Sequence, residues 1–250
     1  MDLFTADVDK ADACEESWSA FKRMNRRRRA IRDFDGIPIP DEEIEAILNE
    51  GLLAPSSSNA QPFVIHWLRT PALKAAGAAA CCNQRAARSA STLLVFVAAN
   101  RFALETTSAF RTYVESTSEL SEKAKAYHLH QLKNGRTFLR IAPSVFWSPL
   151  HSLLSTLFPS LSLVPLGSKA VRNWAARSAL FAAQTIMLAA SARGLDTCPM
   201  EGFSPHKLSR ILGLKRGDVI PIVVAVGHRR NDALLEPRWR RSYEMAVRAH

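Results

Sequence analysis

Two groups of arginines, far apart in the chain, carry much of the net charge of +10 in this 250-residue sequence. Residues 26–29 are consecutive arginines, Arg32 follows Arg28 by four positions, and Arg238 and Arg240 lie near the end. Side chains four apart on a helix, or two apart in an extended segment, can turn to the same side. Guanidinium groups bind phosphate through bidentate, charge-assisted hydrogen bonds. The two groups therefore indicate convergence on one phosphate, although a solvated basic surface explains either group alone.

Two polar loops could complete such a site. Residues 55–63 read PSSSNAQPF, and their short hydroxyl and amide side chains can contact the polar edge of a ring. An ordinary helix-to-strand loop has the same composition. Residues 199–203 read PMEGF, in which Gly202 lets backbone amides approach a ligand closely. Backbone amides aimed at a cofactor ring can tune its electronics without adding a titrating group. A plain turn between a helix and a strand is the alternative for this second segment.

The elements that must position these residues are a series of helices and strands. We expect strands at 63–68, 93–98 and 219–226, and helices at 17–28, from residue 41 onward, and at 71–80, 118–133, 171–193 and 204–212. Ser204 is the expected N-cap of the last helix, with Pro205 as its first residue. This order predicts a mixed α/β layered domain. It argues against a Rossmann fold, because no G-x-G-x-x-G motif follows the first strand.

The hydrophobic residues make up 47% of the chain, which is enough for a large core. We expect one domain over residues 21–250, preceded by an N-terminal arm over residues 1–20. An apolar insertion at about 140–169 is broken by four prolines and is too interrupted to span a bilayer. We interpret it as a lid or an extended dimer contact, with a peripheral membrane anchor as the alternative.

The four cysteines show no paired spacing, and the acidic, polar N-terminus lacks the features of a secretory signal. We therefore expect reduced thiols and a cytoplasmic protein. The histidines and cysteines form no metal-ligand pattern, so no metal is predicted. A basic nucleic-acid-binding protein is an alternative on charge alone, but no nucleic-acid motif is present and no nucleic-acid partner is expected.

Taken in order, these segments resemble the FMN-dependent nitroreductase family, specifically its oxygen-insensitive NAD(P)H nitroreductase and dihydropteridine reductase branch. Residues 28–35 resemble the family's N-terminal phosphate-binding motif, and residues 55–63 resemble its Pro-Ser-Ser-x-Asn-x-Gln-Pro-Trp loop. Residues 83–85 resemble an Asn-Glu-Arg segment that contacts the flavin ring. The central helix with its Pro-x-Glu-Gly-Phe turn, the closing Gly-His pair and the basic tail are matched by residues 174–203, 227–228 and 237–240.

The resemblance implies an α+β fold: a nitroreductase-like three-layer α-β-α sandwich that is helix-rich, has a mixed, mainly antiparallel sheet, and is dimeric. It also implies a homodimer with FMN at the subunit interface. The implied activity takes hydride from NAD(P)H and reduces an electron-poor acceptor, a nitroaromatic or a quinone, by a ping-pong mechanism. The alternative on the same fold is another flavin reaction: dehydrogenation, reductive dehalogenation or flavin breakdown.

The resemblance also assigns roles to individual positions. Arginines of both groups would surround the FMN phosphate, Arg32 and Asn83 would reach the pyrimidine, and the backbone amides of Glu201 and Gly202 would face flavin N5 and O4. No catalytic side chain is assigned, because flavin N5 does the chemistry. Residues 56–59 would come from the partner subunit or line the mouth of the site. The full cofactor-binding set is Arg28, Arg29, Ala30, Arg32, Pro55, Ser56, Ser57, Ser58, Asn59, Gln61, Asn83, Pro199, Met200, Glu201, Gly202, Arg238 and Arg240.

Two positions depart from the family pattern. Ala30 replaces a serine, which removes one expected phosphate hydrogen bond, and Ala86 replaces a lysine expected near the flavin N1/O2 edge. A cation at that edge stabilises the negative charge of reduced flavin, so its loss makes reduction harder unless Arg85 or Arg32 compensates.

Overall fold

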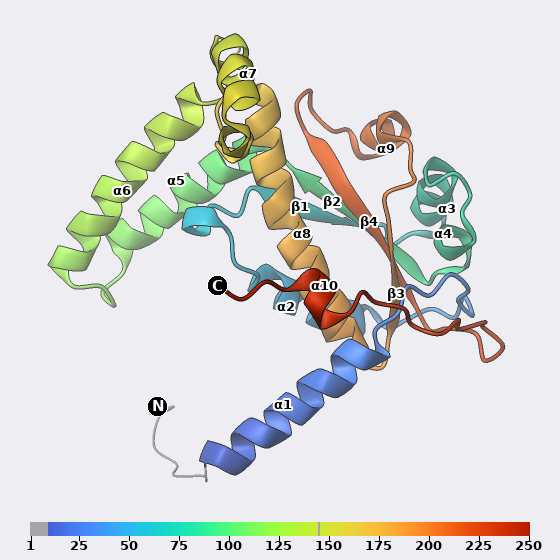
Figure 1. Ribbon diagram of the computed structural model, residues 1–250. Helices are drawn as coiled ribbons and strands as arrows, with labels where there is room; N and C mark the ends of the chain where they lie inside the picture. Colours follow the sequence, from blue (N-terminus) through green and yellow to red (C-terminus); the bar gives the residue numbers. More distant parts are fainter. Residues whose placement is uncertain (1–9, 145) are drawn as a thin grey trace.

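The computed structural model describes residues 10–144 and 146–250, so residues 1–9 of the expected N-terminal arm lie outside it (Figure 1). In the described part, four strands form one antiparallel sheet in the order β1-β2-β4-β3. The strands are β1 (Phe63–Trp67), β2 (Thr92–Ala98), β3 (Asp196–Met200) and β4 (Val219–Gly227). A single isolated parallel bridge joins Ala30 to Thr197 on β3, outside the named strands.

Helices cover both faces of this sheet. The odd-numbered residues 93–97 of β2 point into one apolar core, and the even-numbered residues 94–98 point into another. The first core is closed by α3 (Pro71–Ala80), α4 (Arg85–Ser89) and α9 (Pro205–Leu212), and the second by α2 (Asp41–Leu52) and α8 (Ser168–Ala192). Because both faces are buried, β2 is apolar from Leu93 to Ala98 instead of alternating with polar residues. The three-layer α-β-α sandwich is therefore confirmed.

Close packing of α2 against α8 requires a residue without a side chain at position 51. A Cβ atom at Gly51 would lie 2.3 Å from Cγ1 of Ile186, a fully buried side chain of α8. The N-cap expected for α9 is also present, because Ser204 Oγ accepts a hydrogen bond from Lys207 N at 3.3 Å.

Three expectations about element boundaries are wrong. Helix α1 spans Lys10–Arg27, so residues 10–20 are helical where a loose arm was expected. Exposed side chains one turn apart contact each other in this part of the helix, since Ser19 Oγ donates a hydrogen bond to Glu15 Oε1 at 3.4 Å. Strand β3 was not expected, because only residues 199–203 were considered, as a turn; Pro199 fits in the strand because β3 is an edge strand of the sheet. The helix expected at 118–133 is α6 (Glu122–Ile141), which begins later and extends further.

Residues 100–163 form a helical arm on one side of the sandwich (Figure 1). Helix α5 (Asn100–Ser116) packs against α6, and the shorter α7 (Trp147–Leu157) leads into the 3₁₀ segment η2 (Pro159–Leu163). Apolar side chains of the expected insertion are exposed: Phe146, Leu150, Leu153, Leu157 and Phe158. Among the described residues, no helix combines the length and apolar character needed to cross a membrane.

The cysteines are unpaired. Cys81 and Cys198 are buried, and burial raises the pKa of Cys81 to about 11. Neither buried thiol is therefore a reactive thiolate near neutral pH.

A buried carboxylate joins three segments at the outer edge of the sheet. Asp196 begins β3, and its side chain is 4% exposed. Its Oδ2 accepts hydrogen bonds from the backbone N of Arg229 at 3.1 Å and from Nε of Arg229 at 2.9 Å. Arg27, at the end of α1, lies 3.8 Å away. The hydrogen bonds that Arg229 donates to Asp196 raise the pKa of Arg229.

Replacing Asp196 by alanine is expected to lower the free energy of unfolding by about 3–5 kcal/mol, because it leaves a partly buried guanidinium without its partner. Glu115→Ala is the control, since it removes the exposed i, i+4 pair with Arg111, worth only about 0.2–0.5 kcal/mol. Urea denaturation of the two variants measures the difference. Equal losses would show that the Asp196 cluster does not hold the sheet edge.

Candidate functional site

An open cleft of about 690 Å³ lies beside the outer strand β3. Four distant stretches of the chain line it: residues 28–33, Arg85, Pro199 and residues 232–240. Of the sequence-predicted site residues, the cleft contains Arg28, Arg29, Ala30, Arg32, Pro199, Arg238 and Arg240. The structure thus places both arginine groups on one cleft.

Backbone pairing holds the first segment in place. After α1 the chain runs extended beside β3, with Ile31 N donating to Thr197 O at 3.0 Å. Further on, Asp35 N donates to His228 O at 2.9 Å, after the end of β4. Ile31 and Phe34 are buried in the core. Since these side chains face inward, Arg32 is left exposed at the cleft.

The arginines of the cleft repel one another. Burial, followed by the charges of Arg240 and Arg29, lowers the pKa of Arg28. Burial, followed by the charges of Arg29, Arg28 and Arg240, lowers the pKa of Arg238. Within residues 10–144 and 146–250, none of these four guanidinium groups is paired with a carboxylate. Such an uncompensated cluster is chemically suited to a multiply charged anion.

The C-terminal segment is tied to the end of α1. The guanidinium of Arg238 donates to the carbonyl oxygens of Asn25 at 3.2 Å, Arg26 at 2.8 Å and Arg28 at 2.6 Å. These are carbonyls of the last helical turn and the residue after it, so Arg238 acts as a C-terminal cap. Only part of its hydrogen-bonding capacity is left for a ligand, which sequence reasoning did not anticipate.

Arg27 turns away from the cleft. Its guanidinium donates to Leu195 O at 2.8 Å and to Ser191 O at 3.2 Å, at the end of α8. A cation at a helix C-terminus is favourable because the partial charge there is negative. The run of arginines at 26–29 is therefore divided between a structural role for Arg27 and a place in the cleft for Arg28 and Arg29.

Gln84 is a residue of this region that sequence reasoning missed. Its Nε2 donates to Gly202 O at 2.5 Å, which joins the 83–85 segment to the PMEGF turn. A Cβ at Gly202 would lie 2.9 Å from the same nitrogen, so a side chain there would displace Gln84. The sequence signal that could have identified Gln84 is its position next to Asn83, a predicted site residue. Asn83 itself is exposed with φ +52° and does not line the cleft, and Met200 is buried in the core.

The family resemblance implied that Ala86 removes a cation from the flavin edge, but the structure places this residue in the core. Ala86 is 2% exposed and packs in the core, so its side chain does not face the cleft. Arg85 lines the cleft instead, and its Nη2 lies 2.5 Å from Oδ2 of Asp33. Ala30 does line the cleft, so the hydroxyl that it lacks is missing from the site.

The serine-rich loop lies elsewhere in the chain. Residues 57–59 form the short segment η1 (Ser57–Asn59) and line a separate cavity of about 470 Å³ with α5, α6 and Trp174. Gln61 N donates to Ser56 Oγ at 3.0 Å, and Gln61 Nε2 donates to Asn59 Oδ1 at 3.0 Å. Three of its residues, Ser58, Asn59 and Gln61, have positive φ angles. Within one chain, this preformed loop with Pro55 at its start does not reach the arginine cleft (Figure 1).

In the described ranges, no group of three or more His, Cys, Asp or Glu side chains could hold a metal ion.

Comparison with known proteins agrees with this arrangement. The model of the nitroreductase family matches residues 26–228, from the first arginine group to the end of β4. The chain belongs to the nitroreductase family. The matched region contains the whole sheet and the first wall of the cleft, whereas the tail that carries Arg238 and Arg240 follows it.

Three similar proteins each share between 20% and 28% sequence identity with this chain. A Thermus thermophilus protein named NADH dehydrogenase is 28% identical over 202 residues, which cover 81% of this chain and 83% of the relative. The structure of the candidate nitroreductase ydfN from Bacillus subtilis has a TM-score of 0.75 at 20% identity and covers 93% of this chain and all of that one. A candidate nitroreductase from Exiguobacterium sibiricum, solved in complex with FMN, has a TM-score of 0.70 at 21% identity, covering 92% and 97%. The two solved structures show that the fold is shared.

Proposed function

We propose that this protein binds FMN in the arginine cleft and acts as an oxidoreductase. The observation that carries the proposal is the group of four arginines around one cleft without a carboxylate partner in the described structure. An FMN phosphate is a dianion that needs such charge-assisted hydrogen bonds. The cleft volume of about 690 Å³ is in the range of small-molecule and cofactor sites. The Exiguobacterium relative, which was solved with FMN, supports the same assignment.

The residues around the cleft would hold each part of the cofactor. Arg28, Arg29 and Arg240 would bind the phosphate, with Arg238 contributing what its capping role leaves free. At the ring, the backbone of Glu201 and Gly202 is exposed, and the hydrogen bond from Gln84 fixes the orientation of the Gly202 carbonyl. Arg32 and Arg85 supply positive charge on this side of the cleft, which favours negative charge on a reduced ring.

FMN would supply two-electron chemistry there, accepting a hydride from NAD(P)H and returning the electrons to an electron-poor acceptor such as a nitroaromatic or a quinone. The residues around the cleft would hold the cofactor so that donor and acceptor use the same site in turn, which is a ping-pong scheme. Each cycle oxidises one NAD(P)H and, with protons from solvent, reduces a nitro group to nitroso and water, or a quinone to its hydroquinone. The Thermus relative named NADH dehydrogenase supports a nicotinamide donor.

The active form would be a homodimer. The loop at residues 56–59 lines a cavity of its own, so a second copy is required to bring it to the cleft. Helix α2 ends with the exposed Leu52, the exposed Leu53 follows it, and α8 carries the exposed Leu180 and Phe181. Apolar side chains gathered on one layer are typical of a surface that a partner covers.

Arg28→Ala combined with Arg240→Ala should weaken FMN binding by at least about 100-fold, since each charge-assisted hydrogen bond contributes about 1.5–3 kcal/mol. Arg238 is left intact because its loss would also uncap α1. Titration of flavin fluorescence measures the dissociation constant. Arg241→Ala, which removes a guanidinium outside the cleft that donates to Met245 O, is the control and should bind FMN normally. Unchanged FMN affinity in the double variant would place the phosphate elsewhere.

The FMN-loaded protein should oxidise NADH or NADPH and reduce a nitroaromatic and a quinone. Parallel lines in double-reciprocal plots with donor and acceptor varied together would identify the ping-pong scheme. Flavin that stays oxidised under both nicotinamides in the absence of oxygen would contradict the reductase assignment while leaving FMN binding intact.

Phe181→Asp should produce a monomer that retains FMN poorly, because a charge replaces an apolar side chain that is 55% exposed on α8. Sedimentation velocity measures the mass of the variant, and the visible spectrum measures its flavin content. Leu73→Asp changes an exposed leucine on α3, on the other side of the sheet, and should leave the mass of a dimer. A wild-type protein that sediments as a monomer with bound flavin would refute the dimer.

A further inference from the structure

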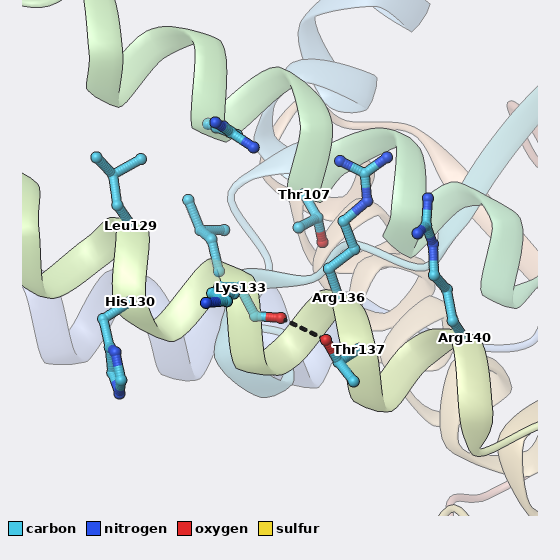
Figure 2. A pocket seen from close by; sticks show the side chains of 9 residues that line it. Thr107, Leu129, His130, Lys133, Arg136, Thr137 and Arg140 are labelled. Carbon is cyan, nitrogen blue, oxygen red and sulfur yellow. Dashed lines mark hydrogen bonds between the residues drawn. The ribbon is translucent and has the colours of Figure 1, made fainter.

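A second basic cleft lies between α5 and α6, outside the arginine site. It has a volume of about 420 Å³ and contains Thr107, Arg111, Lys133, Arg136 and Arg140. Figure 2 shows the guanidinium groups of Arg136 and Arg140 both extending from α6 toward α5. They are four residues apart on one helix, which places them on the same face.

The charge in this cleft is largely uncompensated. Arg111 forms an ion pair with Glu115, with Nε 2.7 Å from Oε1. For Lys133, Arg136 and Arg140, the described residues provide no carboxylate within ion-pair distance. Nε of Arg136 is buried and has no hydrogen-bond partner among them. A buried donor without a partner is unfavourable, and two neighbouring cations add repulsion, so the cleft is built to receive an anion.

The basic cleft adjoins the cavity of the serine-rich loop. Thr107 and Leu132 line both. The adjoining cavity, about 470 Å³, is mostly apolar and contains the aromatic side chains Phe110, Tyr127, Phe138 and Trp174, with Ser57–Asn59 at its edge. The aromatic-lined cavity therefore borders the loop expected beside the partner's flavin, and it shares Thr107 and Leu132 with the cleft that holds the unpaired cations.

We propose that Arg136 and Arg140 bind the anionic end of the electron acceptor, so that acceptors with an aromatic or apolar body and a carboxylate are the preferred class. The body of the acceptor occupies the aromatic cavity, and the carboxylate binds the guanidinium groups of Arg136 and Arg140. This inference rests on the proposed flavin-dependent reduction, and it makes Arg136 and Arg140 determinants of acceptor specificity.

The test compares two acceptors of the same size, 4-nitrobenzoate and 4-nitrobenzamide, with FMN-loaded enzyme and saturating NADPH. The wild-type enzyme should show the lower KM for the benzoate. In Arg136→Gln combined with Arg140→Gln, the ratio of the benzoate KM to the amide KM should rise about tenfold, as expected for a lost charge-assisted bond. Lys123→Gln removes an exposed cation of α6 that lies outside both cavities and should keep the wild-type ratio. Far-ultraviolet circular dichroism and the flavin spectrum verify folding of each variant.

A KM ratio that does not change in the double variant would overturn the proposal. So would a rise in the KM for NADPH but not for NADH, because the cleft would then bind the 2′-phosphate of the donor. Failure of the proposed function looks different: the wild-type enzyme would reduce neither acceptor. If it reduces both without preferring the benzoate, the proposed function stands and this inference fails.

Discussion

The site depends on the buried carboxylate of Asp196. It receives hydrogen bonds from Arg229, which follows β4, and lies 3.8 Å from Arg27, which ends α1. Because Asp196 begins β3, these contacts fix three segments to the edge of the sheet where the extended residues 30–35 pair with it. Arg28 and Arg29 of the cleft follow Arg27 directly, and Arg238 and Arg240 lie in the segment after Arg229. The cleft that holds Arg28, Arg29, Arg238 and Arg240 therefore stands on a sheet edge held by a buried ion pair.

Arginines of the two basic groups have different structural roles. Arg27 caps α8, Arg238 caps α1, and Arg28 stays largely available at the cleft. The caps satisfy carbonyls that the helix ends would otherwise leave without partners. They also bring the late segment 232–240 against the early segment 28–33. Helix termination and assembly of the site are thus achieved by the same hydrogen bonds.

Sequence patterns predicted the parts of the fold that local chemistry determines. The α9 N-cap, the limits of α3 and the apolar strands β2 and β4 follow from capping residues and hydrophobic runs. Strand β3 could not be recognised, since its five residues include a proline and owe their conformation to pairing with β4. Likewise, the Gln84–Gly202 and Arg238–Arg26 contacts join residues more than 100 positions apart. The side chain of Ala86 points into the core because of the way α4 is rotated about its axis, and no local sequence signal predicts that rotation.

The α5–α6 hairpin is joined to the rest of the molecule at its base. Phe102 of α5 packs in the first core, Arg101 Nη2 lies 2.9 Å from Oδ2 of Asp218, and Ala103 and Leu139 pack with Ala60 and Trp174. Changes along the outer length of this hairpin can therefore accumulate without disturbing the sheet. In evolutionary terms the hairpin is a module: it can drift, lengthen or be exchanged between homologues while the redox scaffold is inherited intact.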